Sequence, residues 1–211
     1  GVLDKEPSLI GKTTTTGTPM RPAILAAAAV PFAAPGPNEP LRMLVVGGSQ
    51  GARVMSDIVP GAIEKLRPAL WQRLVLTQQV RDEDMARVRV AYDRLKIEAE
   101  LAPFFADLPA RLASSHLIIS RSGAGTVAEL GAIGRPSVLV PLPGAIDQDQ
   151  FANAGVLVAA GGAIRILQSA CTPDRPGAAL AGLVGCCFPG SGLSSRVFRS
   201  RFSKSGSASS S

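Results

Sequence analysis

Two glycine-rich segments carry the strongest chemical signal in the sequence. The first, Gly47-Gly48-Ser49-Gln50-Gly51, follows an apolar run and precedes an amphipathic one, which predicts a strand, a tight loop and a helix. The first N–H groups of a helix have no partner within it, and the helix dipole makes that end positive. The glycines would let a diphosphate approach these amides, and the Ser49 hydroxyl could add a hydrogen bond.

This first segment does not match the standard nucleotide fingerprints. Val46 stands where the dinucleotide pattern GxGxxG needs its first glycine, and no GK[ST] follows as in a P-loop. A tight turn without any ligand remains the alternative interpretation.

The second segment, Ser120-Arg121-Ser122-Gly123-Ala124-Gly125-Thr126, repeats the same arrangement after the apolar run 117–119. Thr126 offers a hydroxyl, and Glu129 lies about one helical turn further on. A carboxylate at that position could accept hydrogen bonds from two ribose hydroxyls. Alternatively, Glu129 is only an acid in the first turns of a helix, where it favours the helix dipole.

The third polar segment spans residues 141–153. Gln150 and Asn153 are three residues apart, so a helix would place both amides on one face, where they suit sugar hydroxyls. Asp147 and Asp149 resemble a metal-binding DxD pair, but acids before a helix are more often caps, and we predict no metal.

The other residues that could carry chemistry are expected to have structural roles. His116 is the only histidine and begins an apolar run, which indicates a histidine at the edge of a strand rather than a catalytic group. Trp71 and Tyr92 are expected to pack against helices or strands.

These segments need a scaffold of alternating strands and helices, and the chain has that pattern. Apolar runs at 43–46, 74–76, 97–101, 117–119 and 138–140 alternate with helical patterns up to about 66, over about 82–96 and from about 150. This predicts an α/β fold with a Rossmann-like, doubly wound parallel sheet, whose ligand lies beyond the carboxyl ends of the strands.

The chain divides into three parts. We expect residues 1–40 to be an interdomain linker and a remnant of a preceding domain, because they are rich in Pro, Thr and Ala. Residues 41–170 form the predicted nucleotide-sugar-binding domain. Residues 171–211, rich in Gly, Ser and Arg, are expected to be a low-complexity tail that is disordered or frame-shifted. Because the chain starts with Gly1, we expect it to be a piece of a longer protein.

Composition argues against several function classes. The net charge of +6 is concentrated at the end: five of 22 basic residues but one of 16 acidic residues follow residue 170. The nearly neutral main body gives no support to nucleic-acid binding. The three cysteines, Cys171, Cys186 and Cys187, lack metal or redox spacing, and no apolar run reaches the length of a membrane span.

Four motifs together resemble the C-terminal half of the MurG family of GT-B glycosyltransferases, in the same order and spacing. They are Gly17-Thr18-Pro19-Met20-Arg21, Val45 to Ala52, Arg121 to Glu129 and Asp149 to Ala154. The resemblance covers roughly residues 10–170. It implies a donor-binding Rossmann-like domain and an inverting transfer, without cofactor, of N-acetylglucosamine from UDP to the lipid-linked muramoyl sugar lipid I. The product would be lipid II, a precursor in peptidoglycan biosynthesis.

The resemblance also assigns roles to individual residues. It implies that Arg21 and Ser49 contact the donor nucleotide, that the backbone at Phe105 meets uracil, and that Gln150 reads the sugar. Ribose and phosphate would be held by Ala124, Gly125, Thr126, Val127, Ala128 and Glu129. Phe105 replaces a more usual aliphatic residue, and Gly17-Thr18-Pro19 replaces a commoner Gly-Asn-Pro.

No catalytic residue is expected in this chain. In the family, the missing N-terminal domain binds lipid I, supplies the general base and carries the membrane-facing patch, which implies a peripheral enzyme on the cytoplasmic face of the bacterial inner membrane. Two alternatives stay open: a nucleotide-binding module without transfer activity, and another GT-B enzyme with a soluble acceptor.

Overall fold

A computed structural model describes residues 18–143 and 149–170, without the side chains of residues 49–51. In this part of the chain, six parallel strands form one sheet in the order β3-β2-β1-β4-β5-β6. The strands are β1 (Leu41–Val46), β2 (Leu74–Gln79), β3 (Ala99–Ala102), β4 (Leu117–Ser120), β5 (Ser137–Leu139) and β6 (Ala163–Arg165). This order is that of a doubly wound Rossmann-type sheet, as the sequence predicts.

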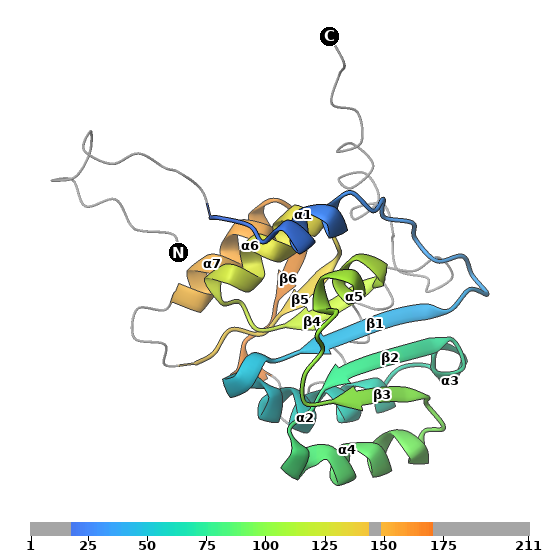
Figure 1. The fold of residues 1–211 in the computed structure, drawn as a ribbon. Helices are drawn as coiled ribbons and strands as arrows, with labels where there is room; N and C mark the ends of the chain where they lie inside the picture. Colours follow the sequence, from blue (N-terminus) through green and yellow to red (C-terminus); the bar gives the residue numbers. More distant parts are fainter. Residues whose placement is uncertain (1–17, 144–148, 171–211) are drawn as a thin grey trace, which may run out of the picture.

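Helices cover both faces of the sheet (Figure 1). On one face lie α2 (Gly48–Glu64) and α4 (Asp82–Arg94), with the short α3 (Pro68–Trp71) preceding β2. The other face carries α1 (Pro22–Ala28), α5 (Leu108–Ser114), α6 (Ala124–Ile133) and α7 (Asp149–Ala159); a 3-10 helix, η2 (Gln168–Ala170), follows β6. Among the described residues, no helix is both long and apolar enough to cross a bilayer.

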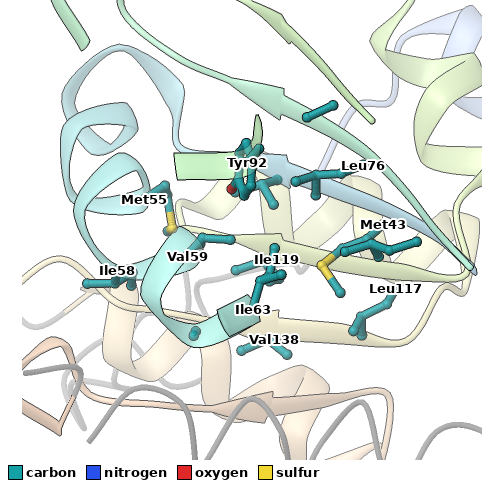
Figure 2. Close-up of a cluster of buried hydrophobic side chains, with 14 of the residues drawn as sticks. Met43, Met55, Ile58, Val59, Ile63, Leu76, Tyr92, Leu117, Ile119 and Val138 are labelled. Carbon is teal, nitrogen blue, oxygen red and sulfur yellow. The ribbon is translucent and has the colours of Figure 1, made fainter. Parts of the chain in front are cut away.

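The sheet separates two aliphatic cores. Met43 and Val45 of β1 belong to the core on the side of α2 and α4. Figure 2 shows Met43 in this core together with Met55, Val59 and Tyr92. The alternate residues of β1, Leu44 and Val46, belong to the second core with α1, α5 and α6. Because successive side chains of a strand point to opposite faces, one nearly continuous apolar strand supplies both cores.

Local sequence explains where several helices begin and end. Pro22, Pro68 and Pro109 stand in the first turn of α1, α3 and α5, where a missing N–H costs nothing. Helix α6 ends at Gly134, whose left-handed backbone donates its N–H to the Leu130 carbonyl.

The structure adds elements that the sequence analysis did not specify, namely α3, α5, β6 and α1. The last of these lies within the predicted linker 1–40. Helix α1 packs against α5 and α6, and its Ile24 is fully buried. The predicted helices and strands otherwise appear within a few residues of their expected positions. The tail 171–211, with all three cysteines, lies outside the described residues.

Candidate functional site

A cleft of about 330 Å³ lies at the carboxyl ends of the strands. Its walls come from the loops after β1 and β4, which are neighbouring strands with Val46 paired to Ser120. The strand order reverses between these two strands, and loops diverge from such a point to leave a crevice. The two glycine-rich segments, which begin at Gly47 and Ser120, therefore share one cleft.

The first glycine loop turns sharply into α2. Gly47 precedes the helix, and Gly48 has a φ of +67°, a left-handed conformation that favours glycine. The Gly48 N–H donates to Oε1 of Gln79 at 3.1 Å, so this amide is already engaged by a side chain. Ser49, Gln50 and Gly51 form the first turn of α2, and the predicted Ser49 hydroxyl contact lies outside the described side chains.

The second glycine loop leads into α6 in a similar way. Gly123 precedes the helix without a capping side chain, so the amides of its first turn are available to a ligand. Thr126 and Glu129 line the cleft, whereas Ala124 and Gly125 are exposed in the first turn. Val127 is buried in the core, which leaves only its backbone for a ligand. The partly buried Ala128 follows it and does not line the cleft.

An ion pair links the two predicted nucleotide contacts. Nη2 of Arg21 donates to Oε1 of Glu129 at 2.7 Å. Arg21 precedes α1 in an extended conformation, and the packing of α1 on α6 brings the two residues together. Arg135, two residues after the end of α6, donates to the carbonyls of Val30 and Ala113, which fastens the segment after α1 to the body.

The loop between β3 and α5 closes another side of the cleft. The Phe105 side chain is buried, and the Arg111 guanidinium lies 4.4 Å from the centre of its ring. Arg111 also pairs with Asp107 and Glu100, and the hydrogen bond from Arg111 lowers the pKa of Asp107. The Phe105 side chain is therefore held in place, and the contact of its backbone with uracil stays a prediction. Phe104, by contrast, is 74% exposed at the cleft.

Gln150 lines the cleft from the start of α7. Its Oε1 accepts the Leu142 N–H at 3.0 Å, and its own carbonyl accepts the Ser122 hydroxyl at 2.7 Å. Within the described residues, its side chain therefore has the Nε2 donor left for a ligand. Asn153, expected to lie beside it as a second sugar-binding amide, is buried and does not line the cleft. That expectation is wrong because this face of α7 packs onto the body of the domain.

Arg121 and Gln79 are two cleft residues that the sequence analysis did not single out. The buried Arg121 donates to the carbonyls of Val140 and Pro141 and to Gln168, which ties the loop after β4 to the segments that follow β5 and β6. Gln79 is the last residue of β2 and lies beside the first glycine loop. Their roles depend on long-range contacts that no local motif signals.

His116 has the structural role that the sequence indicates. Nδ1 of His116 accepts the backbone N–H of Arg42 at 3.0 Å, and the backbone N–H of His116 donates to the Arg42 carbonyl. Burial, followed by the charge of Arg42, lowers the pKa of His116. The histidine does not line the cleft.

Metal ligands do not gather in the part of the chain that the structure describes: residues 18–143 and 149–170 hold no group of three or more His, Cys, Asp or Glu side chains that could bind a metal ion. Of the possible DxD pair, Asp149 lies in the first turn of α7, and Asp147 lies outside the described residues.

Comparison with known proteins gives consistent matches. The family model described as the glycosyltransferase family 28 C-terminal domain matches residues 42–182. The UDP-N-acetylglucosamine--N-acetylmuramyl-(pentapeptide) pyrophosphoryl-undecaprenol N-acetylglucosamine transferase of Nitrobacter hamburgensis is 84% identical over 183 residues, which are 87% of this chain and 50% of that protein. The protein of the same name from Bradyrhizobium diazoefficiens is 78% identical over 83% of this chain and 48% of its own length.

A solved structure agrees with these relatives. The crystal structure of MurG from Acinetobacter baumannii matches with a TM-score of 0.62 and 31% identity, over 70% of this chain and 44% of that one. This chain spans about half the length of the curated relatives that it matches.

Proposed function

Because this chain belongs to glycosyltransferase family 28 and carries the C-terminal domain of that family, we propose that its cleft binds UDP-N-acetylglucosamine as the sugar donor. The complete protein would transfer N-acetylglucosamine to lipid I and form lipid II in peptidoglycan biosynthesis. The names of relatives up to 84% identical state this donor and a lipid-linked muramyl pentapeptide acceptor.

One observation carries the proposal: two helix N-termini meet in a single cleft. Gly47 and Gly48 at the start of α2, and Gly123 and Thr126 at the start of α6, line the same space. Each end brings amide donors and a positive dipole, so their convergence favours a ligand with two adjacent negative groups. A nucleoside diphosphate has this charge distribution.

The cleft has suitable groups for the rest of the donor as well. The uracil would lie at the loop of Phe104 and Phe105, and the ribose hydroxyls near the carboxylate of Glu129 beside Arg21. Nε2 of Gln150, which has no partner among the described residues, would donate to a sugar hydroxyl.

The proposed chemistry of this half is stabilisation of the leaving group. As the bond between the sugar and the diphosphate breaks, negative charge develops on UDP. Amides and dipoles that already point at this charge lower the barrier because they need no reorganisation. The general base and the lipid acceptor site would lie in the other half of the protein. The complete protein would act as a peripheral enzyme at the cytoplasmic face of the membrane.

Calorimetry tests donor binding directly. The chain should bind UDP-N-acetylglucosamine and UDP more tightly than ADP or NAD, with equal affinity in the presence of a metal chelator. A folded sample that prefers ADP or NAD would indicate a nucleotide-binding module of another kind. No detectable binding of UDP would contradict the proposal.

A chimaera tests the complete reaction. Joining this chain to the N-terminal half of the Nitrobacter hamburgensis relative, its 84% identical counterpart, should restore UDP release with a lipid I analogue. The chain alone should release no UDP, because it lacks the proposed acceptor half. A chimaera that accepts only soluble sugars would support a different acceptor class.

A further inference from the structure

Gln79 stands at the junction of two cleft loops. It is the last residue of β2, where the strand pairs with β1 on one side and β3 on the other. Its strand neighbour Gln78 is fully buried beneath Tyr92, whereas Gln79, on the opposite face of the sheet, is half-buried and lines the cleft.

The Gln79 amide bridges these loops through both of its polar atoms. Oε1 accepts the Gly48 N–H at 3.1 Å, and Nε2 donates to the Pro103 carbonyl at 3.0 Å. The partners lie 31 and 24 residues away in the chain. An amide side chain accepts at its oxygen and donates at its nitrogen, so the two bonds define its orientation.

The two partners belong to opposite ends of the proposed donor site. Gly48 begins α2 in a left-handed conformation and belongs to the diphosphate loop. Pro103 immediately precedes Phe104 and Phe105 in the loop proposed to meet the base. Neither loop has sheet pairing beyond the ends of β1 and β3, so the Gln79 amide is a direct connection between them.

From this geometry we propose that Gln79 is a positioning residue that sets the spacing between the base loop and the diphosphate loop. It thereby determines the affinity for a nucleoside diphosphate, a ligand long enough to engage both loops at once. The inference rests on the proposed function. Binding sites gain affinity when their groups are held in the bound geometry before the ligand arrives, because less ordering is left to be done.

The test compares a ligand that spans both loops with one that does not. In the 211-residue chain, Gln79→Met keeps the side-chain volume and removes both hydrogen bonds, while Gln79→Ala removes the amide without placing a thioether in the cleft. The affinity for UDP, measured by calorimetry, should fall about five-fold in both variants, as expected for the loss of one to two net hydrogen bonds. The affinity for uridine, followed by NMR titration, should change less than about two-fold, because uridine carries no diphosphate and does not engage the diphosphate loop.

Gln72→Met is the matched control. Gln72 is exposed at the end of α3, before β2 and at the opposite end of that strand from the cleft. This variant should bind UDP like the unaltered chain.

Each outcome decides between specific alternatives. UDP binding by Gln79→Met and Gln79→Ala within about two-fold of the unaltered chain overturns the inference alone. An equal loss for UDP and uridine also overturns it, because Gln79 would then only support the base loop. A loss confined to Gln79→Met shows steric obstruction and contradicts the inference. Failure of the unaltered chain to bind UDP overturns both the inference and the proposed function.

Discussion

Nη2 of Arg21 lies 2.7 Å from Oε1 of Glu129, although 108 positions separate the two residues in the chain. The side chain of Arg21 is 62% exposed and that of Glu129 is 21% exposed. An ion pair this accessible contributes little to stability, at most about 1 kcal/mol. The ion pair instead orients the Glu129 carboxylate: Arg21 binds one of its oxygens, while the carboxylate stays at the cleft.

Glu129→Ala should therefore impair binding rather than folding. We expect the affinity for UDP to fall about ten-fold, equivalent to about 1.4 kcal/mol, through loss of charge-assisted hydrogen bonds to the ribose. Calorimetry and urea unfolding measure the two effects separately. Glu64→Ala is the control, since it breaks the comparable exposed pair between Glu64 and Arg94 and should leave UDP binding unchanged. A large loss of stability without a loss of affinity would refute the proposed ribose contact.

Gly48 and Gly134 form a second matched pair. Their φ angles are +67° and +68°, and a Cβ added at either position would have no neighbouring atom within 4 Å. Alanine at each site should cost about 1–2 kcal/mol of folding free energy for conformational reasons alone. Only Gly48→Ala should also weaken UDP binding, because Gly134 ends α6 at its far end from the cleft. Urea unfolding and calorimetry on both variants check this, and an equal effect on UDP affinity would contradict it.

Tyr92 and Gln78 make a buried polar pair inside the core of α2 and α4. The Tyr92 hydroxyl donates to Oε1 of Gln78, and Nε2 of Gln78 is buried with no hydrogen-bond partner among the described residues. Tyr92→Phe should destabilise the fold by about 1–3 kcal/mol, because the amide oxygen also loses its partner. Adding Gln78→Met should recover much of this loss in folding free energy, since the double variant has no buried polar group at this site. Denaturant unfolding of the single and double variants measures the coupling, and purely additive losses would argue against it.

His116 should make the fold sensitive to mild acid. Burial lowers its pKa below the ordinary value of 6.5, so the unfolded chain binds a proton more readily than the folded one. The free energy of unfolding must then fall as the pH drops through about 6.5 and on toward the folded pKa. His116→Asn keeps an acceptor for the Arg42 N–H and cannot titrate, so its stability should depend less on pH between 7 and 5. Equal pH profiles for the two proteins would disprove this role.

Several features could be predicted because they depend on local pattern. Apolar runs that alternate with amphipathic segments predicted a parallel sheet, and the glycine loops after 43–46 and 117–119 follow β1 and β4 as expected. Helix α1 was missed because its Ala-rich sequence carries little amphipathic contrast. It is stabilised by packing, with Ile24 buried against the second core.

The type of fold, the two glycine-rich loops and the residues with suitable chemistry could all be predicted from the sequence, because strand and helix periodicity and backbone freedom at glycine are local properties. Tertiary structure alone decided which of these residues meet. It placed β1 beside β4, joined Arg21 to Glu129, buried Asn153 and brought the Gln79 amide between Gly48 and Pro103. The physical reason is that such contacts depend on strand order and on how the helices pack, which no local pattern of residues encodes.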